Sequence, residues 1–288
     1  MICCLSRALQ LASEYPKGDG VPKIIHQTWK TEQVPDAWAP SRASWTSLHP
    51  DWTYILWTDD DIDVYIKSKW PDDYDMFKSL PYTIQRVDLW RYYVLRDFGG
   101  LYSDLDIMPI ASINSYVSNQ SIQLVPSANE PSVFTNALMI SGNDQVSKMF
   151  WTLLIEEVKE YVKSHTLSVT SAASRHMEIM ESTGPLALTR AARNFTLPIL
   201  LLPSKVWNPY DLSLADMPDE QTSKHAIIKI LPGSSWHSAD SSLISFALVY
   251  KGPIITFFVL LILFYIVKSE IVKTKFAFLR RRKIGKSV

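Results

Sequence analysis

The sequence has 288 residues, of which 47% are hydrophobic, so the chain is long and apolar enough to bury a core and is not disordered. Lys and Arg together number 29, as do Asp and Glu, and this neutral balance lacks the signature of a nucleic-acid-binding protein. Cys3 and Cys4 are adjacent, which excludes a disulfide framework and leaves acylation near a membrane as an alternative use.

Strands and helices are predicted to alternate from residue 22 onward. Residues 22–29, "PKIIHQTW", are a β-branched run after a proline and predict a first strand. Residues 41–50 favour a helix that Pro50 ends, and 52–58 predict a second strand. Residues 82–98 carry apolar side chains close to a helical period.

Gly99-Gly100 is expected to end that helix, because glycine tolerates the left-handed conformation of a C-cap. The later elements continue the alternation: strands at 101–110, 121–126 and 136–141, a helix at 144–164, two helices at 171–194 interrupted by Gly184-Pro185, and strands within 197–207 and 224–233. This order predicts an α/β fold with a largely parallel sheet.

The spacing Asp-x-Asp occurs four times, and its surroundings separate one occurrence from the others. The pairs at 59–61, 61–63 and 73–75 lie where helices are predicted to start, and acidic side chains there cap unpaired backbone N–H groups. Asp104 and Asp106 instead lie beyond a strand. If residues 102–106 are extended, both carboxylates point to one side and form a hard oxygen site suited to Mg²⁺ or Mn²⁺. The alternative is an ordinary acidic turn.

The helix before this pair carries two further charged residues. Asp88 and Arg91 are three positions apart and therefore share one helix face. The alternative is an ion pair on the protein surface.

The C-terminal part predicts a membrane segment. Residues 243–267 contain one charge, Lys251, and are long enough to span a bilayer, with a buried core helix as the alternative. Residues 268–288 carry eight basic residues and one acid, which places this tail in the cytoplasm by the positive-inside rule. A domain at 21–242 would then be luminal. The N-terminal segment, 1–20, is too short and polar for a convincing signal, and its role stays open.

Two asparagines agree with the luminal side, because Asn119-Gln-Ser121 and Asn194-Phe-Thr196 fit the acceptor pattern for N-glycosylation.

Four motifs resemble one family in their order and spacing. They are "PKIIHQTW", Asp88-x-x-Arg91, "GGLYSDLD" and the later "GSSWH". Together they are similar to the D-x-D glycosyltransferases of family 32, and most of all to the fungal mannosyltransferases that act on inositol phosphoceramide. The resemblance is strong over about residues 21–111, thinner at 136–141 and at Gly184-Pro185, and returns over 232–240.

The resemblance implies a GT-A (Rossmann-like) catalytic domain at 21–242. It also implies a retaining transfer of mannose from GDP-mannose to inositol phosphoceramide, with a divalent metal that is usually Mn²⁺ and alternatively Mg²⁺. The expected location is the membrane of the secretory pathway, at the Golgi, with a membrane-bound regulatory subunit as a candidate partner. Alternatives are another nucleotide sugar or a glycan acceptor, or a catalytically silent membrane-anchored subunit of such an enzyme.

The resemblance also implies roles for individual residues. Asp104 would contact the ribose or sugar of the donor, Asp106 would ligate the metal, and Asp88 and Arg91 would hold hydroxyls of the transferred sugar. The remaining expected site residues come from three other motifs: His26 and Trp29 beside the base, Tyr102 with the donor, Trp236 at the phosphates, and His237 at the metal or diphosphate. For His26 and His237 the alternatives are a core histidine and a loop histidine.

Overall fold

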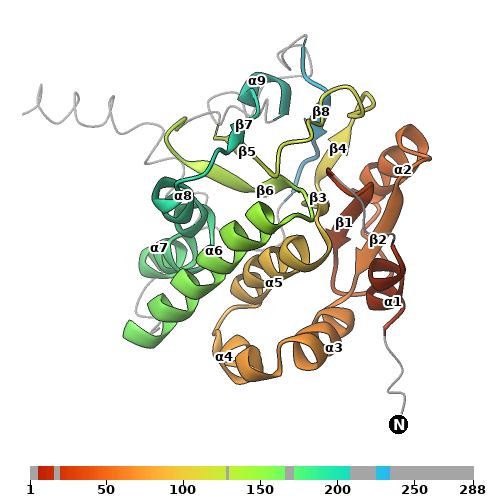
Figure 1. The fold of residues 1–288 in the computed structure, drawn as a ribbon. Coiled ribbons are helices and arrows are strands. Elements are labelled where there is room, and N and C mark those ends of the chain that lie inside the picture. Colours follow the sequence, from red (N-terminus) through yellow and green to blue (C-terminus); the bar gives the residue numbers. More distant parts are fainter. Residues whose placement is uncertain (1–5, 16–19, 128–129, 166–171, 208–224, 234–288) are drawn as a thin grey trace, which may run out of the picture. The chain divides into compact units, whose positions relative to one another are not determined.

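The computed structural model describes residues 6–15, 20–127, 130–165, 172–207 and 225–233. Its strands form a six-stranded sheet in the order β2-β1-β3-β6-β5-β7 and a two-stranded sheet of β4 and β8. Figure 1 shows the strands, whose bounds are β1 Ile24–Thr28, β2 Thr53–Trp57, β3 Gly100–Ser103, β4 Ile107–Pro109, β5 Ile122–Pro126, β6 Phe134–Ser141, β7 Leu200–Leu201 and β8 Ile228–Ile230.

The larger sheet is mixed, with one reversed strand. β1 pairs in parallel with both β2 and β3, and β5 pairs in parallel with β7. β6 runs antiparallel to β3 and to β5. The prediction of a largely parallel sheet is therefore confirmed, and β1, β2 and β3 end at the same edge.

The helices agree with the predicted order. Their bounds, together with one 3-10 turn, are α1 Arg7–Glu14, α2 Ala39–Leu48, α3 Asp59–Lys69, η1 Pro71–Asp73, α4 Tyr74–Ser79, α5 Thr83–Phe98, α6 Gln145–Ser164, α7 Ala172–Ser182, α8 Pro185–Asn194 and α9 Ser204–Trp207. The competing D-x-D pairs lie at or near helix starts, although Asp63 falls beyond the first turn of α3 and the Asp73 side chain does not cap α4. Thr58 and Asp61 form a capping box at α3, and Asp75 lies in the first turn of α4.

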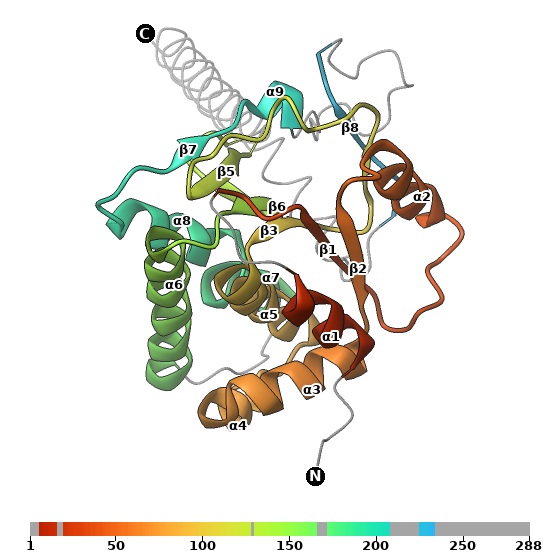
Figure 2. The same ribbon diagram turned by 45° about the vertical axis from the view of Figure 1, so that its right-hand side comes forward.

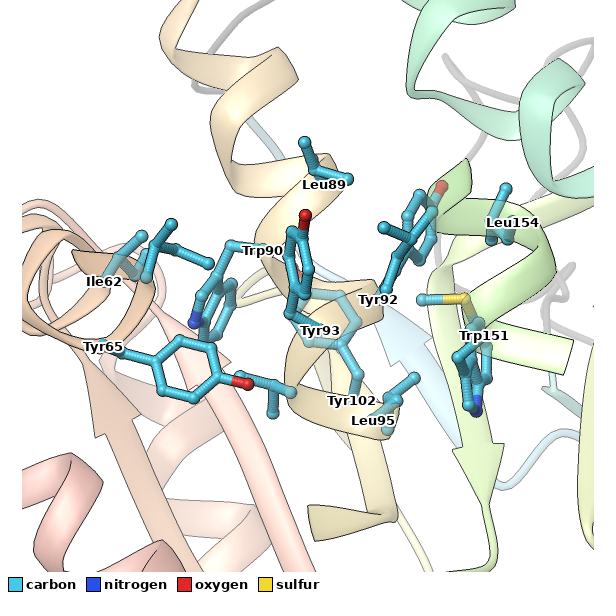
Figure 3. Close-up of a cluster of buried hydrophobic side chains, with 14 of the residues drawn as sticks. Ile62, Tyr65, Leu89, Trp90, Tyr92, Tyr93, Leu95, Tyr102, Trp151 and Leu154 are labelled. Carbon is cyan, nitrogen blue, oxygen red and sulfur yellow. The ribbon is translucent and has the colours of Figure 1, made fainter. Parts of the chain in front are cut away.

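Alternate residues of the strands face two separate cores. One face packs against α1, α3, α5, α6 and α8, and the other against α2, α9 and the β4–β8 pair. On β3 this alternation sends Leu101 to the second core and Tyr102 to the first. Figure 3 shows the aromatic centre of the first core, where Trp90, Tyr92 and Tyr93 of α5 lie between Tyr65 of α3 and Trp151 of α6.

The N-terminal helix α1 belongs to this first core. Ala8, Leu9 and Ala12 of α1 are buried in it, and the Ser6 side chain caps the helix. Residues 7–14 therefore pack with the domain that was predicted to begin at residue 21.

Among the described residues, no helix is both long and apolar enough to cross a membrane. The predicted membrane segment, 243–267, and the basic tail lie outside these residues.

Candidate active site

The acidic pair lies in a turn directly after β3. The strand ends at Ser103, and the N–H of Ile107 donates to the carbonyl of Asp104 across 3.1 Å, which closes the turn before β4 begins. The expectation that 102–106 is extended is thus wrong, because the chain turns at 104–106 to leave the large sheet for the small one. Asp104 and Asp106 consequently do not alternate along a strand, although both carboxylates lie at its carboxyl end.

The backbone of this turn is held from three directions. The N–H of Asp104 donates to the carbonyl of Ala137 on β6 at 2.7 Å, and the Asp104 carbonyl accepts from Nε2 of Gln27 on β1 at 3.0 Å. The carbonyl of Asp106 accepts from the N–H of Leu231, just after β8, at 2.7 Å. Because each neighbouring strand contributes a bond, the position of both carboxylates is fixed by the fold.

Asp104 is oriented by two side chains from the first core. The hydroxyl of Tyr102 donates to Oδ1 of Asp104 at 2.6 Å, and Nη1 of Arg91 lies 3.3 Å from the same oxygen. Tyr102 and Arg91 are buried, whereas the Asp104 side chain is 34% exposed. Asp104 therefore offers a carboxylate to a ligand from a rigid, buried support.

Arg91 connects the turn to α5 and to β6. Its guanidinium lies 3.0 Å from Oδ1 of Asp88, donates to the carbonyl of Asn136 at 2.6 Å, and lies 4.4 Å from the centroid of the Tyr102 ring. Burial acts to lower the pKa of Arg91, but Asp104, Tyr102 and Asp88 outweigh it and raise that pKa. The side chains of Arg91 and Asp88 are 2% and 4% exposed, so the alternative of a surface ion pair is wrong.

Asp88 is held by two residues that the sequence analysis did not place in the site. Asn136 donates through Nδ2 to Oδ1 of Asp88 at 3.0 Å, and the hydroxyl of Thr183 donates to Oδ2 at 3.2 Å. Burial, opposed by Arg91 and these hydrogen bonds, raises the pKa of Asp88 to about 7. Two sequence features could have identified these residues. Asn136 is a polar residue at the start of the apolar run "NALMIS", and Thr183 directly precedes Gly184-Pro185.

Asp106 differs from Asp104 in having little support for its side chain. In the part of the chain that the structure describes, no other side chain donates a hydrogen bond to its carboxylate, and its own backbone N–H acts to lower its pKa. Burial and the neighbouring carboxylate of Asp104 raise the pKa of Asp106 to about 7. Asp88 and Asp104 thus pair with one guanidinium, and the nearby carboxylate of Asp106, which has less support, suits a cation.

His26 lies beside Tyr102 in the sheet, but its ring is engaged by residues of the first core. His26 is fully buried, with Nε2 3.0 Å from the carbonyl of Gly99 and Nδ1 accepting from Nε1 of Trp57 at 3.1 Å. Both ring nitrogens are engaged in the core, so the alternative of a core histidine describes His26, and the expected contact with a donor base does not.

Trp29 lies beside the acidic turn. It follows β1, meets Trp38 edge to face at 5.1 Å between ring centroids, and packs on the small cluster that contains Leu105. Trp29 is partly exposed, as a residue that stacks on a base would be. Trp236 and His237 lie outside the described residues, and their expected roles stay predictions. Tyr102 is buried and acts through Asp104, so its expected direct contact with a donor is not supported.

The described residues contain no group of three or more His, Cys, Asp and Glu side chains able to hold a metal ion. The donor set at the turn is therefore two carboxylates, both hard oxygen ligands of the kind that Mg²⁺ and Mn²⁺ take.

Comparison with known proteins confirms the predicted resemblance. Residues 35–123 match the model of the glycosyltransferase sugar-binding region containing the DXD motif. The chain is 30% identical to mannosyl phosphorylinositol ceramide synthase CSH1 of Saccharomyces cerevisiae over 83% of this chain and 61% of the relative. It is 29% identical to inositol phosphoceramide mannosyltransferase 3 of Schizosaccharomyces pombe, over 86% of this chain and 64% of the relative.

The chain spans less than two thirds of the length of these two relatives. A solved structure titled PaToxG glycosyltransferase covers 64% of this chain and 72% of its own, at 14% identity and a TM-score of 0.44. The match at residues 35–123 shows that this chain contains a glycosyltransferase sugar-binding region with the DXD motif.

Proposed function

We propose that this protein, whose residues 35–123 carry the glycosyltransferase sugar-binding region with the DXD motif, transfers mannose from GDP-mannose to inositol phosphoceramide in sphingolipid synthesis. One observation carries the proposal. Asp104 is held rigidly by Tyr102 and Arg91, while the half-buried Asp106 lies beside it without such support. A pair of this kind at the carboxyl edge of a sheet suits the diphosphate end of a nucleotide sugar. The two yeast relatives are a mannosyl phosphorylinositol ceramide synthase and an inositol phosphoceramide mannosyltransferase, which supports mannose and the lipid acceptor.

The proposal includes the GT-A form of the α/β fold and a membrane location. The domain would be luminal in the Golgi, tethered by residues 243–267, with a membrane-bound regulatory subunit as a partner. A tether of this kind suits a lipid acceptor, because it confines the enzyme to the surface where the headgroup lies.

A divalent metal, Mn²⁺ or Mg²⁺, fits the acidic turn. Burial and the neighbouring carboxylate of Asp104 raise the pKa of Asp106, and a cation between the two carboxylates would offset both the burial of charge and the repulsion. Asp106 would hold the ion, with His237 as a further candidate ligand. When bound, the ion would neutralise the negative charge that develops on the departing diphosphate.

The residues of the chain would contribute positioning and charge. Arg91 holds the carboxylates of Asp88 and Asp104 in one orientation, so that hydroxyls of the donor meet fixed acceptors without rearrangement. Family resemblance implies retention at the anomeric carbon. Because no protein nucleophile is identified, the acceptor hydroxyl would attack from the face that the diphosphate leaves, and the departing phosphate would take its proton.

The test is transfer of labelled mannose by purified protein, with inositol phosphoceramide in detergent micelles and Mn²⁺. Asp106→Asn should lower kcat by about a hundredfold or more, because it removes a charged ligand at the reacting end of the donor. Asp75→Asn, in another Asp-x-Asp pair that lies at the start of α4, is the matched control and should leave transfer unchanged.

Two results would contradict the proposal. Transfer to a glycan but not to the lipid would favour the alternative acceptor, and equal activity of Asp106→Asn and wild type, or no activity in either, would favour a catalytically silent subunit.

A further inference from the structure

Among the buried polar atoms that have no hydrogen-bond partner in the described ranges are Nε of Arg91 in the active site and two atoms between α5 and α7. These two are the hydroxyl oxygen of Tyr82 and Oε1 of Glu178. Tyr82 precedes α5, and Glu178 lies on α7, which packs against α5 (Figure 2). Leaving such an atom unpaired costs the desolvation of a polar group, so folded proteins rarely keep one without a cause.

Gln85 ties these two residues together. Its Oε1 accepts from the backbone N–H of Tyr82 at 3.2 Å, and its Nε2 donates to the hydroxyl of Ser182 at 2.9 Å. Burial raises the pKa of the Glu178 carboxyl, and the amide of Gln85 lies close enough to Glu178 to act in the lowering direction. We call Tyr82, Gln85, Glu178 and Ser182 the α5–α7 polar cluster.

The α5–α7 polar cluster adjoins the active site along two chain segments. Gln85 and Asp88 are three residues apart on α5 and share a face. Ser182 and Thr183 are consecutive, and while Ser182 accepts from Gln85, Thr183 donates to Asp88. A continuous polar path therefore runs from Asp104 through Arg91 and Asp88 to the unpaired atoms.

We propose that the α5–α7 polar cluster is the acceptor subsite, which binds the hydroxyls of a polyol phosphate headgroup beside the transferred sugar. This inference rests on the proposed function and assigns the place of its acceptor. A polyol hydroxyl donates to the Glu178 carboxylate and exchanges a hydrogen bond with the Tyr82 hydroxyl, so the ligand supplies the two missing partners. The guanidinium of Arg175, 5.2 Å from the centroid of the Tyr82 ring, brings positive charge suited to a phosphodiester.

This arrangement separates stability from function. The free protein carries the cost of the unpaired atoms, and bound acceptor removes it. Deleting the Tyr82 hydroxyl should therefore leave folding unharmed while it weakens acceptor binding, whereas deleting a paired buried hydroxyl weakens folding.

The experiment compares Tyr82→Phe with Tyr93→Phe. The second variant removes a hydroxyl that donates to buried Asp73 at 2.7 Å in the wild type. Tyr82→Phe should unfold at an unchanged or higher urea concentration than wild type, while Tyr93→Phe should unfold at a clearly lower one. Transfer assays should show the KM for inositol phosphoceramide raised about tenfold in Tyr82→Phe and in Glu178→Gln. The KM for GDP-mannose and the slow release of mannose to water should stay unchanged in both variants.

Titration calorimetry with soluble inositol 1-phosphate gives a readout that does not depend on transfer. Binding to wild type that Tyr82→Phe weakens supports the subsite even if mannose transfer fails. The proposal is overturned if inositol 1-phosphate does not bind wild type, if it binds both proteins equally, or if Tyr82→Phe destabilises the fold as much as Tyr93→Phe does. An unchanged acceptor KM in both Tyr82→Phe and Glu178→Gln overturns it as well.

Discussion

At the residue scale, the active site brings three carboxylates close together and provides one buried guanidinium, that of Arg91, to balance their charge. Arg91 lies within ion-pair distance of Asp88 and of Asp104, and Asp106 adds a third carboxylate. A buried charge that loses its partner is more costly than the pair is stabilising. The site therefore depends on the residues that keep the pair together.

Asn136 is such a residue, because it contacts both members of the pair. Asn136→Ala removes the amide donor to Asp88 and should lower the free energy of unfolding by about 1–3 kcal/mol. It should also lower kcat for mannose transfer by about tenfold or more, because Arg91 and Asp104 lose their fixed orientation. The control is Thr189→Val, another buried hydrogen-bonding side chain on β6's neighbour α8, which should lose stability without a selective loss of kcat. Equal loss of kcat in both variants would contradict the role of Asn136.

His26 predicts a pH dependence of stability. Burial lowers the pKa of His26 to about 4, from 6.5 when exposed, so folding favours the neutral ring. Its contribution is fully present above pH 6.5 and is lost as the pH falls toward 4, by about 3 kcal/mol in total. Asp88 and Asp106 have the opposite effect on stability. Because their pKa values are raised to about 7 in the folded protein, they favour folding increasingly as the pH falls below 7.

The measurement for His26 is therefore a difference between two proteins. Urea unfolding at pH 7 and at pH 4.5 should show that His26→Gln costs stability at pH 7 and much less at pH 4.5, because glutamine does not titrate. If His26→Gln lowered the free energy of unfolding equally at pH 7 and at pH 4.5, the ring of wild-type His26 would not be held neutral by folding.

At the scale of the element, the passage from α5 into β3 sets where the acidic turn lies. Gly99 and Gly100 have φ values of 67° and 88°, in the region that favours glycine. A Cβ at Gly100 would lie 2.5 Å from the carbonyl oxygen of Ile24 on the neighbouring strand β1. The double glycine therefore ends the helix and also allows β1 and β3 to approach.

Gly100→Ala should accordingly lower the free energy of unfolding by at least about 2 kcal/mol, from left-handed strain plus the clash with β1. Gly142→Ala is the comparison, since its Cβ would meet a side-chain oxygen of Asp144 at 3.0 Å and its φ is not in the left-handed region. Gly142→Ala should lower the free energy of unfolding by less than Gly100→Ala does. Thermal unfolding of both variants checks this, and an equal loss in the two would show that backbone strain at Gly100 is not the cause.

At the scale of the whole molecule, the N-glycosylation pattern offers a test of the proposed luminal side. Asn119 and Asn194 are both exposed. Asn119 lies just before β5, a strand that runs in the same direction as β3, so a glycan there would be at the edge opposite to Asp104.

If the domain is luminal, endoglycosidase treatment of protein from cells should reduce its apparent mass in two steps. Asn119→Gln and Thr196→Val should each remove one step, and Thr196→Val leaves the bond between Asn194 and Glu157 in place. Protein that is fully translated and yet unaffected by the enzyme would contradict the luminal assignment.

Periodicity and capping predicted most of the elements correctly, because each depends on residues close in sequence. Pattern alone did not predict the turn at 104–106, since what bends the chain there is its pairing with β8, more than one hundred residues later. Asn136 and Thr183 were missed for the same reason, because only the fold brings them to Asp88. His26 shows the converse: its motif suggested a contact with the donor, and its burial makes it part of the core.

The bond between Asp106 and Leu231 has a consequence for the order of synthesis. Nearby, Nε1 of Trp38 donates to the carbonyl of Pro232, across a sequence separation of 194 residues. Contacts between such distant segments form late, because the second segment must first leave the ribosome. A nascent chain that already contains both aspartates therefore lacks the backbone partner that fixes Asp106. The competence to bind a donor would appear only when nearly the whole domain has been translated, so an interrupted chain would carry the motif without a formed site.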